Sequence, residues 1–150
     1  MKSTFFLLLL SLSVLGLTAQ SGTSDWPSTI LAFDVTTTGV QVTGSLAIER
    51  HFHPKPGFHT FIGGGIFAAK DGGLASDEIG PFLEAGFWTG KRNHHFEMRA
   101  GITAYDYSSP EFYPVGSIGY RWHNPEKPLI FRIFLGNVTG IGLGLVLGKK

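Results

Sequence analysis

Apolar and polar residues alternate with a period of two along most of the chain after residue 20. In the segment 94–106, for example, Phe96, Met98 and Ile102 share one face, and Glu97 and Arg99 share the other. Successive side chains of a strand point to opposite faces of a sheet, so this alternation indicates β-strands with two unlike faces. Gly, Pro and β-branched residues interrupt every window in which a helical period could develop. The pattern therefore predicts an all-β protein.

The alternating segments are separated by short runs of turn-forming residues such as Thr38-Gly39, Lys91-Arg92-Asn93 and Asn124-Pro125. Eight strands are expected, at 28–37, 40–52, 57–69, 78–90, 94–106, 112–123, 128–137 and 139–148. The segment 58–69 is ambiguous, because it is apolar on both faces and contains three consecutive glycines. Hairpin connections of this length favour a single eight-stranded antiparallel up-and-down β-barrel.

The N-terminus has the organisation of a secretory signal peptide. Lys2 provides the positive charge, Phe5–Leu17 forms an apolar run, and Thr18-Ala19-Gln20 ends it. The run is shorter than the ~20 residues of a transmembrane helix. We therefore expect a signal peptide at 1–20 with cleavage near 19/20, followed by one barrel domain at 21–150. A retained membrane anchor is the alternative.

Composition narrows the function classes. Cysteine is absent, which excludes disulfides, thiolate metal sites and a cysteine nucleophile. The formal net charge of +1 gives no field that would attract nucleic acid. Charged residues make up only 15% of the chain, whereas 21 residues are glycine. A chain with few charges and many glycines is compatible with strands that lie in a membrane.

The polar face of the strands distinguishes a membrane barrel from a soluble one. It contains few lysines, many glycines and isolated charges near strand centres: Glu49, Glu84, Glu97, Arg99, Arg121 and Arg132, with Asp34 as a further candidate. A transmembrane barrel is apolar outside and polar inside. The pattern thus predicts a transmembrane-type barrel whose interior is closed by ion pairs. We expect Gly80, Gly86, Gly101, Gly119, Gly142 and Gly144 to make space for these charges.

Aromatic residues near the expected strand ends are placed as membrane-interface girdles would be. They are Phe52, Trp88, Tyr105, Phe112 and Trp122. Trp88 and Tyr105 fall on the polar face, so they fit this interpretation less well than the other three.

Three segments carry a family resemblance. Tyr113–Trp122, the following Leu129–Ile133 and the earlier Leu46–Phe52 resemble strands of the small outer-membrane β-barrel proteins of Bacteroidetes-type bacteria. The resemblance implies an outer-membrane location and, as partners, outer-membrane lipid and the barrel-assembly machinery. Such proteins usually end on an aromatic residue that this machinery reads, whereas the present sequence ends in Gly148-Lys149-Lys150.

Candidate chemistry beyond the charges is sparse. His51, His53, His59, His94 and His95 lack the spacing of a metal site, and we expect them at the surface or at an interface. Ser117 is a candidate interior nucleophile, but no histidine is expected to reach it. The sequence therefore predicts a non-catalytic protein without a cofactor or metal, in a structural or envelope-interaction role. Two alternatives are a soluble periplasmic or secreted barrel that binds an apolar ligand, and an outer-membrane lipid-modifying enzyme.

Overall fold

The computed structural model describes residues 29–37, 41–55, 57–71, 78–105 and 111–147. The side chains of 53–55, 71 and 105 are not among the described parts. The expected signal peptide at 1–20 lies outside the described residues.

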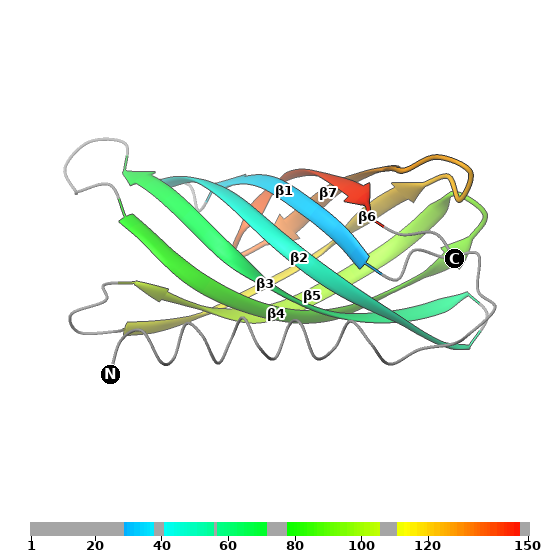
Figure 1. Cartoon of the computed structure of the whole chain (residues 1–150). Helices are drawn as coiled ribbons and strands as arrows, with labels where there is room; N and C mark the ends of the chain where they lie inside the picture. The colour runs from blue at the N-terminus through cyan, green and yellow to red at the C-terminus, as the bar shows by residue number, and fades with distance from the viewer. Residues whose placement is uncertain (1–28, 38–40, 56, 72–77, 106–110, 148–150) are drawn as a thin grey trace.

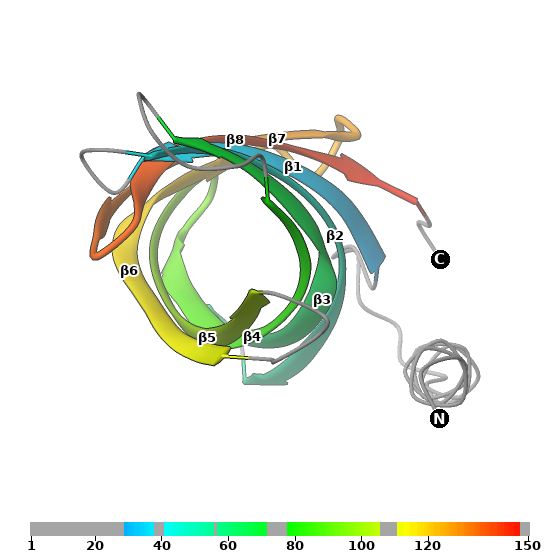
Figure 2. The same cartoon turned by 90° about the vertical axis from the view of Figure 1, so that its left-hand side faces the viewer.

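The chain forms a closed barrel of eight strands (Figures 1 and 2). The strands are β1 (Thr29–Thr37), β2 (Gln41–Lys55), β3 (Phe58–Asp71), β4 (Glu78–Lys91), β5 (His94–Tyr105), β6 (Glu111–His123), β7 (Leu129–Gly136) and β8 (Thr139–Val146). Each strand pairs antiparallel with the next, and β8 closes the ring by pairing with β1. The predicted up-and-down barrel and its eight strands are confirmed, with strand ends within three residues of expectation.

The two ends of the barrel differ in their connections. We name the end with the connections 56–57, 92–93 and 124–128 the turn end, and the opposite end, with 38–40, 72–77, 106–110 and 137–138, the loop end. The first and last described residues both lie at the turn end, where the Leu147 amide donates to the Thr29 carbonyl. Figure 2 views the barrel from the loop end.

The strands are unequal in length. β7 and β8 have 8 residues each and β1 has 9, whereas β2 to β6 have 12 to 15. Because β1, β7 and β8 are neighbours in the ring, the barrel wall is lower on one side than on the other.

Outward and inward faces are sharply different. The outward face exposes large apolar side chains on every strand, among them Phe33, Leu46, Ile48, Ile62, Ile66, Leu83, Met98, Ile118, Ile133 and Leu143. The charged outward positions of the described strands are Lys70 and Lys91, at or next to the last residues of β3 and β4, and Arg50, which lies within β2 and pairs with Thr29 at the start of β1. The ambiguous segment 58–69 follows the same rule, since Phe61 and Phe67 are buried while Ile62 and Ile66 are exposed.

One strand edge is closed by a side chain. β7 pairs with β6 only from Ser117 to His123, so the first half of β6 has no strand beside it on that side. Asn137, in the β7–β8 turn, fills part of this gap. Its Oδ1 accepts from the Gly116 amide at 2.7 Å, and its Nδ2 donates to the Pro114 carbonyl at 2.8 Å. The side-chain amide thus takes the place of a strand's backbone amide.

No helix among the described residues is long and apolar enough to cross a membrane.

Candidate functional site in the barrel lumen

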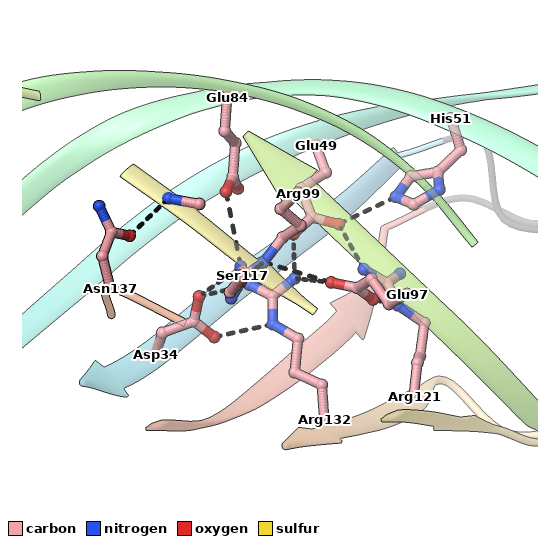
Figure 3. A network of polar contacts seen from close by, with 11 residues as sticks. Asp34, Glu49, His51, Glu84, Glu97, Arg99, Ser117, Arg121, Arg132 and Asn137 are labelled. Carbon is pink, nitrogen blue, oxygen red and sulfur yellow. Dashed lines mark hydrogen bonds and ion pairs between the residues drawn. The ribbon is translucent and has the colours of Figure 1, made fainter. Parts of the chain in front are cut away.

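Seven charged side chains meet inside the barrel (Figure 3). They come from six strands: Asp34 (β1), Glu49 (β2), Glu84 (β4), Glu97 and Arg99 (β5), Arg121 (β6) and Arg132 (β7). All seven side chains are less than 10% exposed. Their inward direction follows from the alternation along each strand, because every one of them shares parity with its strand's other lumen residues. The six residues predicted as the interior charge network are among them.

Arg132 links the two carboxylates on the β1–β2 side of the lumen. Its Nε and Nη2 donate to the two oxygens of Asp34 at 2.8 and 2.7 Å, which is the bidentate geometry that a guanidinium favours. Its Nη1 donates to Glu49. One planar side chain thus satisfies acceptors on two neighbouring strands.

Arg121 and Arg99 extend the network along the barrel axis. Arg121 donates to Glu97 and, through Nη2 at 3.2 Å, to Glu49. Arg99 lies nearer the loop end, where Nη1 contacts Asp34 at 3.1 Å and Glu84 at 3.5 Å. Charges removed from water need partners of this kind, because an unpartnered buried charge costs several kcal/mol.

Aromatic rings pack against the guanidinium groups. The Arg99 guanidinium carbon lies 4.0 Å from the centre of the Phe134 ring, and that of Arg121 lies 5.5 Å from the rings of Phe61 and Trp88. The ring faces carry partial negative charge and so attract the cations. Ion pairs and rings together fill the middle of the lumen.

A short chain of hydrogen bonds leads from the network toward the turn end. Trp88 Nε1 donates to His51 Nδ1 at 3.2 Å, so Nδ1 must act as an acceptor. His51 Nε2 then donates to Glu49 at 3.0 Å. This arrangement favours the neutral His51 tautomer with its hydrogen on Nε2.

The expectation that the histidines lie at the surface is wrong for most of those described. His51, His59 and His95 are buried in the lumen, and so is His123. His59 stacks on Trp88 with ring centres 3.8 Å apart. His94 is exposed and hydrogen-bonds to Tyr120, and the side chain of His53 is not described. Because His51 follows Glu49 by two residues on the same strand, the period of two alone predicts that both side chains point into the lumen.

The girdle expectation is wrong for Trp88, which is completely buried inside the barrel. Phe112 is exposed on the outward face, and Phe52 and Trp122 are half-buried. The Tyr105 side chain is not described. Outside, near the turn end, Phe58 stacks on Phe87 with ring centres 5.5 Å apart.

The glycines have more varied neighbours than expected. A Cβ at Gly142 would lie 1.8 Å from Asp34 Oδ1 and 2.7 Å from Arg132 Nε, so this glycine does make space for the charges. Gly80 and Gly86 instead lie against the rings of Phe67 and Phe61, and Gly144 lies against Ile30. Gly63, the first of the three consecutive glycines in the segment 58–69, lies between the side chains of Glu49 and Glu84.

Other candidate chemistry is not assembled in the described part of the chain. No group of three or more His, Asp or Glu side chains there is arranged to hold a metal ion. Ser117 is buried and accepts a hydrogen bond from Arg99 Nε at 3.4 Å, which makes it a neighbour of a cation rather than of a general base.

Comparison of the chain with protein-family models, with curated proteins and with solved structures gave no match. Functional inference therefore rests on the geometry of the barrel.

Proposed function

We propose that this chain is an integral outer-membrane protein whose barrel is closed by ion pairs and has a structural or envelope-interaction role without catalysis. The observation that carries the proposal is the apolar belt on the outward face, together with the charged lumen. In a water-soluble barrel the apolar face points inward. Here the arrangement is reversed, as in barrels that lipid surrounds.

The extent of the belt strengthens this argument. Exposed large apolar side chains occur on all eight strands, and they include Ile62 at 57% and Ile118 at 51% exposed. Soluble monomers rarely expose contiguous apolar patches larger than a few hundred Å². The outward charges at strand ends, Lys70 and Lys91, would lie at the level of lipid headgroups.

The filled lumen supports a role without transport. Ion pairs occupy the middle of the barrel, where a conducting path or a large apolar ligand would need space. An eight-stranded barrel has an interior that side chains just fill. The charged lining also disfavours the alternative of a soluble barrel that binds an apolar ligand.

Membrane fractionation tests the location. The protein, expressed with its N-terminal segment in a Gram-negative host, is expected in the outer-membrane fraction and to resist carbonate extraction. It is also expected to migrate differently on gels before and after heating, because a folded membrane barrel withstands the detergent. Release into the soluble fraction by carbonate would overturn the proposal.

Planar-bilayer recording tests the closed lumen separately. We expect no unitary conductance steps from the wild-type protein after insertion, verified by protease protection of the inserted barrel. Regular conductance steps from the folded wild-type protein would contradict a closed barrel while leaving its membrane location intact.

A further inference from the structure

A small cavity lies in the lumen between the ion-pair network and the loop end. It has a volume of about 80 Å³, which is room for roughly two to three water molecules. Its polar lining includes Asp34, Glu84, Arg99 and Ser117 with several threonine hydroxyls, and its apolar lining includes Phe67 and Phe82. We name this cavity the vestibule. The structural role proposed above does not make use of the vestibule.

The charges around the vestibule do not balance. The ion-pair network contains four carboxylates, those of Asp34, Glu49, Glu84 and Glu97, against the three guanidinium groups of Arg99, Arg121 and Arg132. His51 does not supply the missing positive charge, since its hydrogen bonds favour the neutral form. With all four carboxylates ionised, one negative charge lacks a counterpart among these groups.

Glu84 is the carboxylate with the weakest pairing. Asp34 receives a bidentate contact from Arg132 at 2.7 and 2.8 Å, whereas Glu84 has a single contact of 3.5 Å with Arg99. Its side chain is 9% exposed, and within the described part of the chain its Oε1 has no hydrogen-bond partner although it is buried. A buried carboxylate oxygen normally has a donor. The Glu84 side chain lines the vestibule, while Oε1 itself lies against Gly63, so a donor in the vestibule would meet Oε1 after a turn of the carboxylate group.

The residues that line the vestibule determine which kind of hydrogen-bond donor can bind beside Glu84. Carboxylate oxygens and threonine and serine hydroxyls can accept hydrogen bonds, and Phe67 and Phe82 add apolar lining beside them. A multivalent metal ion would need more acidic or imidazole ligands together than the described residues provide. An alkylammonium group has three N–H donors, one positive charge and a small apolar stem, and it fits this lining.

We propose that the vestibule binds a primary ammonium group, with Glu84 as its main ion-pair partner. The ligand class is a small primary amine or the amino end of a larger one. The volume of the vestibule limits the bound part to about the size of an aminomethyl group.

Titration of the purified, folded protein in detergent micelles with methylammonium, followed by amide chemical shifts, tests this proposal. Wild-type protein is expected to show saturable shifts at Gly101, Ser117 and other residues around the vestibule. Glu84→Gln should weaken binding by about tenfold or more, because it removes a charge-assisted hydrogen bond. Glu78→Gln, on the same strand but outside the vestibule lining, is the matched control and should bind within about twofold of wild type.

Tetramethylammonium distinguishes hydrogen bonding from mere charge, since it has no N–H donor; it is expected to bind at least about tenfold more weakly than methylammonium. Three results would overturn the proposal. They are the absence of saturable shifts in folded wild-type protein, equal binding by folded Glu84→Gln, and displacement of methylammonium by calcium at a stoichiometric concentration.

Gel migration before and after heating verifies that each variant is folded. The titration does not depend on cellular location, so its failure leaves the proposed membrane function untouched.

Discussion

Arg132 is the residue on which most of the lumen network depends, because it bonds from β7 to Asp34 on β1 and to Glu49 on β2. Replacing it with an apolar residue would leave two buried carboxylates short of partners. We expect Arg132→Met to lower the free energy of unfolding by about 3–5 kcal/mol, the usual cost of breaking a buried pair. Unfolding in urea, followed by tryptophan fluorescence in detergent, measures the change. Lys127→Met, in an exposed turn, is the control, and equal midpoints for the two variants would contradict this role.

Replacement of Gly142 tests the same network by steric crowding rather than by loss of a charge. An added methyl group would collide with Asp34 and Arg132, whereas one at Gly44 meets nothing within 4 Å. Gly142→Ala is therefore expected to destabilise the barrel by about 1–3 kcal/mol, as overpacking of a filled interior does. Gly44→Ala should change the unfolding midpoint little. Similar midpoints for both variants would show that the lumen has more room than the contacts indicate.

At the residue scale, the alternation of polar and apolar residues predicted the charged side chains of the network better than it predicted the histidine and aromatic side chains that pack around them. Glu49, Arg121 and Arg132 could be found because a charge on a glycine-rich face stands out. Burial of His59 could not be inferred as readily, because its segment is apolar on both faces, and Trp88 was expected in a girdle although its parity pointed inward. Histidine and tryptophan are common both at interfaces and in interiors, so neither residue type decides its environment without the register.

At the scale of elements, the edge of β6 is the feature that the sequence did not reveal. Asn137 lies next to a predicted turn, where asparagine is ordinary. Its contacts with Pro114 and Gly116 depend on β7 being shorter than β6, and strand length is poorly determined by pattern. Strand existence and facing, in contrast, follow directly from the period of two. Pairing order follows from the short hairpins, which leave neighbouring strands little choice of partner.

Asn137→Ala tests this edge. Loss of the two hydrogen bonds is expected to cost about 1–3 kcal/mol in local stability, since each contributes about 0.5–1.5 kcal/mol. The effect should appear as faster hydrogen exchange of the Gly116 amide. Asn124→Ala is the matched control, because Asn124 accepts from Glu126 in a turn at the other end. Unchanged exchange at Gly116 in Asn137→Ala would show that the side chain does not protect the edge.

At the scale of the whole molecule, the solvent around the barrel decides what a surface charge costs. Leu143 lies at the middle of β8 and Leu147 just beyond its end, and both are about half exposed. If lipid surrounds the barrel, Leu143→Arg should destabilise it by about 2–4 kcal/mol and Leu147→Arg by no more than about 1 kcal/mol. Urea unfolding in phospholipid vesicles measures both. Equal and small effects would indicate water rather than lipid around β8.

The unequal wall height has a consequence for the surrounding bilayer. Eight residues tilted by about 40° span ~20 Å along the barrel axis, less than the ~25 Å apolar band of outer-membrane barrels, whereas β2 to β6 exceed that band. In a membrane, the bilayer beside β7, β8 and β1 would have to become thinner, or the barrel would have to tilt toward that side. In either case the protein creates a hydrophobic mismatch with the bilayer on one side of the barrel only, the side of β7, β8 and β1. That side is where short-chain lipids, or neighbouring proteins with equally short walls, would gather.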